Sequence, residues 1–305
     1  MTDAPLLAIV GPTASGKTVW ALALARKENA EIISVDSRQV YRGLSVGTAK
    51  PSGAWTHSGY RVDGIAYHLL DFLDPSEIFS AARFVEEASA KILDIERRGK
   101  AVILAGGTGL YFNALAEGLT PLPPRNEALR ERLRQEAGAR GREFLHRRLA
   151  KIDGEAAAGI PINNIARVIR ALEVFELTGK PLSVWHREHR ARPAQSSGGA
   201  AAQKRRFTFI GLDPGPEELN RRIESRCRQM LANGMIEETR ALLERGGSEE
   251  CPALSALGYS RVIACLKGRL SQENLLALLI QDTRQYAKRQ RTWFRHQLEV
   301  QWQTP

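Results

Sequence analysis

The sequence has little cysteine and no long apolar run. None of its apolar stretches approaches the ~18 residues of a membrane-spanning helix, so no membrane association is expected. Cys227, Cys251 and Cys265 form no C-x-x-C pair, which argues against a disulfide framework and against a zinc site. A charged and apolar leader is also missing at the N-terminus, and the expected location is therefore the cytoplasm. Nothing in the composition implies a protein partner.

A glycine-rich phosphate-binding motif follows the first apolar run, residues 6–10. Residues 11–18, GPTASGKT, match G-x-x-x-x-G-K-[ST] between this predicted strand and a helical pattern over 19–26. Glycines at these positions allow a nest of backbone N–H donors, the lysine adds a cation, and the final hydroxyl can hold Mg²⁺. The predicted polyphosphate site consists of Gly11, Thr13, Ala14, Ser15, Gly16, Lys17 and Thr18, with Thr18 as the magnesium ligand.

Basic charge is concentrated in one segment of the chain. The formal net charge is +10, and residues 121–206 contain 18 Lys and Arg against 9 Asp and Glu, so nine of the ten net charges fall there. A concentrated basic surface is typical of a protein that binds nucleic acid. Arginine-rich helices with a solvated face would have the same composition, and that alternative stays open.

Apolar runs alternate with helical patterns over most of the chain. The runs at 6–10, 32–35, 101–105 and 207–212 predict buried parallel strands, and the clearest helical pattern between them covers 80–98. The expected fold is α/β, with a P-loop parallel sheet flanked by helices and a site at the carboxyl ends of the strands.

The segment 121–206 interrupts this alternation. It opens with three prolines and then has only helical patterns, which predicts an inserted all-helical domain. Its exit, 192–203, is rich in Ala, Ser and Gly and predicts a flexible connector. The predicted domains are 1–120, the first part of the core; 121–206, the helical insert; and 207–305, the second part of the core with basic C-terminal helices.

Polar residues follow two of the predicted strands. Asp36 comes after 32–35, where a carboxylate beside the phosphate loop can accept a proton; a magnesium ligand or a cap on the next segment is the alternative. Residues 106–109, GGTG, stand where a motor or signalling NTPase usually carries a metal-binding Asp. Thr108 and the neighbouring N–H groups can serve a substrate, although a plain strand-to-helix turn needs the same glycines.

A predicted final helix, 272–296, carries a basic stripe beside aromatic residues. Arg284, Lys288, Arg291 and Arg295 recur at spacings of four, three and four, next to Tyr286, Trp293 and Phe294. Such a stripe suits contact with a nucleic-acid backbone together with stacking. A helix docked by its aromatics, with a solvated charged face, fits equally well.

Six segments, taken together, resemble the bacterial type of the tRNA dimethylallyltransferases, also called tRNA isopentenyltransferases or IPP transferases. In chain order they are 11–18, 36–51, 68–71, 79–84, 106–111 and 283–290. The block DSRQVYRG…GTAKP at 36–51 is far more specific than the P-loop. The resemblance implies transfer of a dimethylallyl group from its diphosphate to the exocyclic amine of the adenosine on the 3′ side of a tRNA anticodon.

The resemblance also implies roles for individual residues. Asp36 would be the base, Lys17, Arg222 and Thr108 would assist catalysis, Mg²⁺ would lie on the Thr18 side, and Arg226 would be a further helper. The implied contacts with the anticodon stem-loop are Asp36, Ser37, Arg38, Gln39, Thr108, Arg167, Arg170, Gly258, Tyr259, Arg261, Arg284 and Lys288. The chain departs from the family at Ala166, where the family usually has Gln.

Two other functions fit part of the pattern. One is a P-loop small-molecule kinase with Asp36 as the base toward a hydroxyl, and the basic insert argues against it. The other is an RNA-binding protein that uses a nucleotide only as a switch, and the density of motifs expected around one cleft argues against that.

Overall fold

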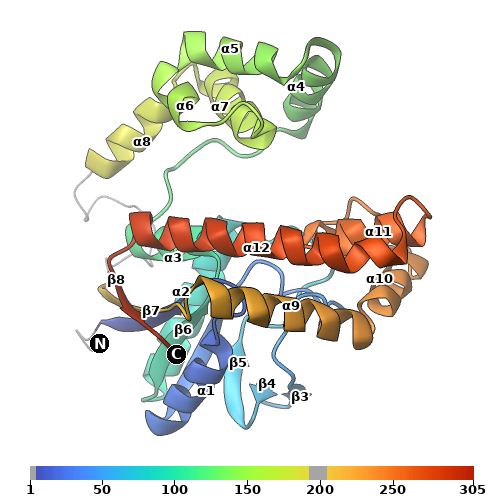
Figure 1. Cartoon of the computed structure of the whole chain (residues 1–305). Helices are drawn as coiled ribbons and strands as arrows, with labels where there is room; N and C mark the ends of the chain where they lie inside the picture. The colour runs from blue at the N-terminus through green and yellow to red at the C-terminus, as the bar shows by residue number, and fades with distance from the viewer. Residues whose placement is uncertain (1–4, 192–204) are drawn as a thin grey trace. The chain divides into compact units, whose positions relative to one another are not determined.

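Two parts of the chain pack separately in the structure, a computed structural model that describes residues 5–191 and 205–305. The first unit combines Met1–Gly118 with Lys204–Pro305, and the second is Leu119–Gln203 (Figure 1). The borders that the sequence predicts, after 120 and after 206, differ from these by two and three residues. The predicted connector 192–203 lies outside the described residues.

The first unit is built on a sheet that, within the described residues, has eight strands in the order β3-β4-β5-β2-β6-β1-β7-β8. Its strands are β1 (Leu6–Val10), β2 (Ala30–Val35), β3 (Ala54–Thr56), β4 (Gly59–Val62), β5 (Ile65–His68), β6 (Ala101–Gly106), β7 (Phe207–Leu212) and β8 (Val300–Gln303). The four strands that the apolar runs predict, β1, β2, β6 and β7, are parallel and lie together at the centre. The predicted α/β class is therefore confirmed. At one edge, β4 pairs antiparallel with both of its neighbours, β3 and β5.

Helices cover both faces of this sheet, because its central strands are apolar on both sides. The helices of the first unit are α1 (Lys17–Lys27), α2 (Ala81–Arg97), α3 (Gly109–Glu117), α9 (Pro216–Ala232), α10 (Met235–Glu244), α11 (Tyr259–Leu266) and α12 (Gln272–Gln297). In β1, Ile9 packs in the cluster that contains α1, whereas Ala8 and Val10 pack in the cluster that contains α2, α3 and α12. Successive strand residues thus face opposite helical layers.

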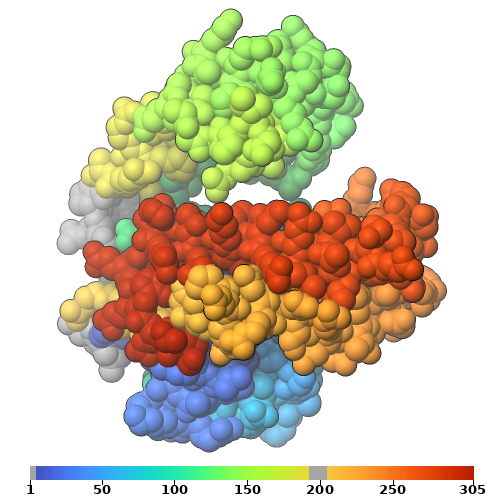
Figure 2. Space-filling view, in the orientation of Figure 1, coloured from blue at the N-terminus to red at the C-terminus, as the bar shows by residue number. Residues whose placement is uncertain are grey.

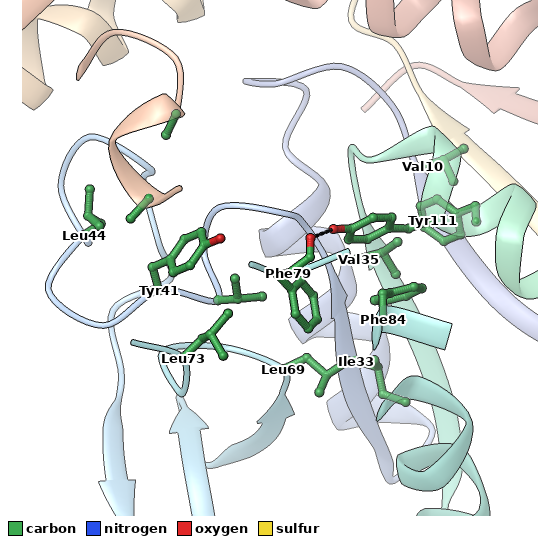
Figure 3. Packing of buried hydrophobic residues seen from close by; sticks show 14 of the residues in the cluster. Val10, Ile33, Val35, Tyr41, Leu44, Leu69, Leu73, Phe79, Phe84 and Tyr111 are labelled. Atoms are coloured by element: carbon green, nitrogen blue, oxygen red, sulfur yellow. Dashed lines mark hydrogen bonds between the residues drawn. The ribbon is translucent and has the colours of Figure 1, made fainter. Parts of the chain in front are cut away.

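Part of the core anchors the loop that follows β2 (Figure 3). The rings of Phe84 and Tyr111 stack with centroids 4.5 Å apart, and the Tyr111 hydroxyl donates to the carbonyl of Phe79 at 2.8 Å. Tyr41 and Leu44, from the loop, are buried in the same cluster. Because these side chains are buried and closely packed, they hold the loop after β2 in one conformation.

The second unit is all-helical in its described part, residues 119–191. Its helices are α4 (Glu127–Arg140), α5 (Arg142–Ile152), α6 (Gly154–Gly159), α7 (Ile165–Thr178) and α8 (Leu182–Ala191). Leu133, Leu145, Leu149 and Leu172 form its own apolar core. A buried carboxylate, Glu173, accepts hydrogen bonds at the edge of that core. In the part of the chain that the structure describes, no helix is both long and apolar enough to cross a membrane.

Candidate active site

A cavity of about 700 Å³ lies where the parallel strands β1, β2 and β6 end. Segments far apart in the sequence line it. They include residues 13–19 at the P-loop and the start of α1, the turn after β2 (36–39), the loop 47–49, the end of β6 (105–107), α9, the stretch 255–257 and α12. Sites in α/β sheets form at this edge, because the loops that leave parallel strands meet there. The cavity therefore lies at the carboxyl ends of the strands, where the sequence predicts the site.

The P-loop, residues 11–18, takes its shape from three small residues. Ala14 and Gly16 have positive φ values of 64° and 93°, a left-handed backbone that turns neighbouring N–H groups to one side. Gly16 is also the N-cap of α1, so the positive end of that helix faces the loop. Gly11 is not in the lining: a Cβ there would lie 2.5 Å from the carbonyl oxygen of Leu212, so it is a glycine for close packing.

Lys17 curls over the loop that precedes it. Its Nζ donates to the carbonyl of Pro12 at 2.6 Å. Burial, with the nearby charge of Arg226, lowers the pKa of Lys17 to about 7, and the negative charge of Asp36 opposes this shift. The negative charge near Lys17 is therefore too small to stabilise its charged form fully. A polyphosphate in the loop would supply that charge.

Asp36 directly follows β2, and one of its oxygens has a structural task. Oδ1 accepts hydrogen bonds from the backbone N–H groups of Arg38 (2.7 Å) and Gln39 (3.1 Å). These bonds fix the carboxylate in the turn after the strand. Oδ2 has no hydrogen-bond partner among residues 5–191 and 205–305, and Asp36 lines the cavity. Capping and proton acceptance are therefore compatible, because they use different oxygens.

Two arginines of α9, one turn apart, also line the cavity. Arg222 reaches the P-loop: its Nη1 lies 3.6 Å from the place where a Cβ of Gly16 would be. Arg226 donates to the carbonyl of Thr48 at 3.4 Å, and its Nε is buried without a partner in the described part of the chain. Burial lowers the pKa of Arg226. A buried donor without an acceptor is costly, so this pair favours an anion in the cavity.

A magnesium site is compatible with this loop but needs the substrate to complete it. No group of three or more His, Cys, Asp or Glu side chains able to hold a metal occurs among the described residues. Mg²⁺ in phosphate-binding sites takes one or two protein oxygens and fills its other positions with phosphate oxygens and water. Thr18, in the cavity lining at the start of α1, would provide one such oxygen.

The turn after β2 supplies three further predicted contact residues, Ser37, Arg38 and Gln39, and all three line the cavity. Two of these side chains also hold the surrounding loops. Arg38 donates to the carbonyl of Pro252 (2.8 Å) and to Ser255 Oγ (2.7 Å). Gln39 donates to the carbonyl of Thr48 at 3.2 Å. Thr108, in contrast, is the N-cap of α3 and lies just beyond the lining residue Gly107.

Tyr259 is predicted to contact tRNA, but the structure buries its side chain. Its ring has no exposed surface, and its hydroxyl donates to Glu238 at 2.6 Å. Glu238 also accepts hydrogen bonds from the N–H groups of Ser45, Val46 and Gly47. The tyrosine is therefore a structural anchor of the loop that enters the cavity. The sequence held no signal for Glu238, which stands in a helical pattern without a motif.

The other predicted contacts of the first unit lie around α11 and α12. Gly258, with φ of 90°, is the N-cap of α11, and Arg261 forms an ion pair with Asp282 at 2.8 Å. Arg284 and Lys288 are exposed on α12, which forms a continuous red band across the face of the first unit in Figure 2. At the end of the predicted stripe, Arg291 and Arg295 both pair with Asp213.

The two predicted contact residues of the insert differ in their surroundings. Arg167 is exposed on α7. Arg170 donates to Glu173 at 2.6 Å and to the carbonyl of Pro123 at 2.9 Å. Glu173 also accepts from Arg130 and from the N–H of Asn126. Arg170 thus has a structural role in the insert, and its contact with tRNA stays a prediction. The charge pattern could not reveal the buried partner.

The fold and the cavity define an α/β P-loop protein with a helical insert. The model of the IPP transferase family matches residues 39–297, and the chain belongs to that family. It is 46% identical to a tRNA dimethylallyltransferase of Halorhodospira halophila and 44% identical to one of Geobacter metallireducens. Both alignments cover 97% of this chain and 91% of the relative. The family is one of prenyltransferases, and the chain is therefore an enzyme of this class.

Solved structures agree with this assignment. The full-length tRNA isopentenylpyrophosphate transferase of Bacillus halodurans superposes with a TM-score of 0.67 at 40% identity, covering 98% of this chain and 89% of that one. A eukaryotic dimethylallyltransferase, studied while acting on tRNA, gives a TM-score of 0.70 at 25% identity, over 97% of this chain and 73% of that one. The family resemblance inferred from the six segments is confirmed.

Proposed function

We propose that this chain transfers a dimethylallyl group from dimethylallyl diphosphate to the exocyclic amine of the adenosine on the 3′ side of a tRNA anticodon, giving N6-(dimethylallyl)adenosine. Membership of the IPP transferase family and the names of its relatives support this. The observation that carries it is one cavity shared by a phosphate-binding loop and a carboxylate with a free oxygen, Asp36. We also propose that the anticodon stem-loop is the part of the tRNA that binds, and that the protein is cytoplasmic.

The donor side of the cavity suits a diphosphate leaving group. Breaking the bond between the allylic carbon and oxygen puts positive charge on the carbon and negative charge on the diphosphate. The P-loop N–H groups, Lys17 and Arg222 surround the place where that negative charge would collect. Thr18 would hold Mg²⁺, which supplies further positive charge to the diphosphate.

The acceptor side needs a base. An adenine amine is a poor nucleophile, because its lone pair is delocalised into the ring. As the new nitrogen–carbon bond forms, one amine proton must leave, and Oδ2 of Asp36 is the oxygen that is available to take it. The acceptor base is stacked in its loop, so it has to turn out into the cavity. Bond formation, bond cleavage and proton transfer then balance without a water or a nucleoside triphosphate.

A transfer assay tests this function directly. The purified chain would be mixed with unmodified tRNA, labelled dimethylallyl diphosphate and Mg²⁺, without ATP. We expect label in the tRNA at one adenosine. A small-molecule kinase would leave the tRNA unlabelled, and a nucleotide-switched RNA-binding protein would bind tRNA without modifying it. Either result would overturn the proposal.

A further inference from the structure

Gln290 of α12 joins two loops of the cavity that are far apart in the sequence. Its Oε1 accepts the backbone N–H of Thr13 in the P-loop at 2.8 Å. Its Nε2 donates to the carbonyl of Gly107 at 2.9 Å. The side chain is only 7% exposed and lines the cavity. One amide thus bridges the loop that follows β1 and the turn that follows β6.

The chemistry of the two partners suits an amide. A backbone N–H can only donate and a carbonyl can only accept, so the bridging side chain must accept at one end and donate at the other. A carboxylate cannot donate, and a thioether does neither well. Both partners are backbone groups, of the buried residue Gly107 and the half-buried residue Thr13. Without Gln290 they would lose their hydrogen bonds in a place that water reaches poorly.

The shape of the turn shows that α12 is fitted closely against it. A Cβ on Gly107 would collide with Nε2 of Gln290, and a Cβ on Gly109 would collide with the ring of Trp293. Gln290 and Trp293 are three residues apart and share a face of the helix. The glycines of this turn therefore allow α12 to approach, and the helix holds the turn at two neighbouring points.

We propose that Gln290 is a positioning residue that fixes the P-loop and the Gly107–Thr108 turn in one geometry. The inference rests on the proposed function, which assigns the P-loop to the diphosphate, and on the prediction that Thr108 of the turn contacts the acceptor. The P-loop, α12 and the turn all belong to the first unit. A shift of the P-loop relative to the turn would separate the reacting atoms, and small misplacements are costly in catalysis.

The test uses the full chain with Gln290→Met, which keeps the length of the side chain but neither accepts nor donates well. Gln297→Met is the matched control, because Gln297 is an exposed residue at the end of the same helix. Two quantities would be measured: calorimetric binding of inorganic pyrophosphate with Mg²⁺, and the single-turnover transfer rate with both substrates saturating. Thermal unfolding would show how much of each variant is folded.

For Gln290→Met we expect about tenfold weaker pyrophosphate binding and a transfer rate at saturation lower by about tenfold or more, per folded molecule. Gln297→Met should match the wild type in both. A merely structural role would lower the melting temperature and leave the rate of the folded molecules unchanged. Gln290→Glu, which keeps the acceptor for Thr13 and loses the donor to Gly107, should also transfer slowly, and it serves if the Met variant does not fold.

Two results would overturn the inference. One is a Gln290→Met variant whose pyrophosphate affinity and saturated transfer rate both equal those of the wild type. The other is weaker pyrophosphate binding with an unchanged saturated rate, because the amide would then serve the P-loop alone. If the wild-type chain itself transfers nothing, the proposed function fails, and the pyrophosphate titration alone decides whether Gln290 holds the loop.

Discussion

At the scale of single residues, the site separates atoms that hold the loops from atoms left for substrates. Oδ1 of Asp36 holds the turn after β2, and Oδ2 is left without a partner in the described residues. The guanidinium of Arg226 holds Thr48 through Nη2, and its Nε is left buried without an acceptor. Substitutions that change these remaining atoms and spare the atoms that hold the loops should leave the fold intact.

Asp36→Asn should slow transfer by ~10²–10⁴ in single turnover, the range expected when a general base is removed. The amide oxygen can still accept from Arg38 and Gln39, so the turn should keep its shape. Pyrophosphate and tRNA affinities, measured on the same preparation, should stay close to those of the wild type. A variant that transfers at nearly the normal single-turnover rate would remove Asp36 from this role.

The lowered pKa of Lys17 predicts that the protein takes up a proton when the diphosphate donor binds. In the free protein the pKa of Lys17 is about 7, lowered first by burial, whereas a bound anion raises it. Binding of pyrophosphate above pH 7 should therefore take up a proton at this side chain, and the affinity should fall as the pH rises. Calorimetry in buffers of different ionisation enthalpy measures that uptake.

Lys17→Met is the control, because it keeps the proton equilibria of pyrophosphate and removes only those of the lysine. The difference in proton uptake between wild type and variant belongs to Lys17. Equal uptake by both proteins at pH 8 would show that the lysine does not change its protonation when the anion binds.

At the scale of helices and strands, the sequence predicted the centre of the sheet well and its edges poorly. The four central strands are apolar on both faces and stand out as runs. The edge strand β3 is fully exposed, and β8 has alternate residues exposed, so neither contains the apolar run that marks a buried strand. The sequence predicted the parts of the site that belong to recognisable motifs, the P-loop and Asp36. Gln290 and Glu238 were missed because each acts through backbone groups of distant loops.

Helix α7 offers a matched pair of arginines on one element, Arg167 and Arg170. Arg167→Ala should weaken tRNA binding and reduce the slope of log affinity against log salt by about one, because one exposed phosphate contact is lost. The melting temperature should not change. Arg170→Ala should instead destabilise the insert by about 1–2 kcal/mol, because Glu173 would lose one of its cationic partners.

The pKa of Glu173 supports a structural role for Arg170. Burial opposes its ionised form, yet hydrogen bonds from Arg130 and Arg170 lower its pKa to about 2. The stabilisation from this carboxylate is therefore present above the pKa of the unfolded chain and is lost as the pH falls toward about 2. Salt titrations of tRNA binding and melting curves of both variants check the pair. Equal loss of tRNA affinity without any loss of stability in Arg170→Ala would show that its guanidinium reaches the tRNA.

At the scale of the whole molecule, each unit has what an independent fold requires. Every strand of the sheet comes from the first unit, so no strand is lost when the second is removed. The second unit has its own apolar core and its own buried carboxylate. Residues 119–203 contain 15 Lys and Arg against 9 Asp and Glu, so six of the ten net positive charges lie in the second unit. Phosphate recognition and nucleic-acid attraction should therefore be separable by a single deletion.

Replacing Leu119–Gln203 by a short Gly/Ser linker should leave a folded protein that binds pyrophosphate and Mg²⁺ with nearly wild-type affinity, because the P-loop, Arg222 and Gln290 all remain. The same protein should lose most of its tRNA affinity, and what remains should depend less on salt, because fewer phosphate contacts release counterions. A cooperative melting curve and calorimetry with pyrophosphate establish that the deleted protein is intact before tRNA is tested. If it is intact and its tRNA affinity and salt slope equal those of the full chain, the basic charge of the insert is a solvated surface, and α12 with the turn after β2 must provide the binding.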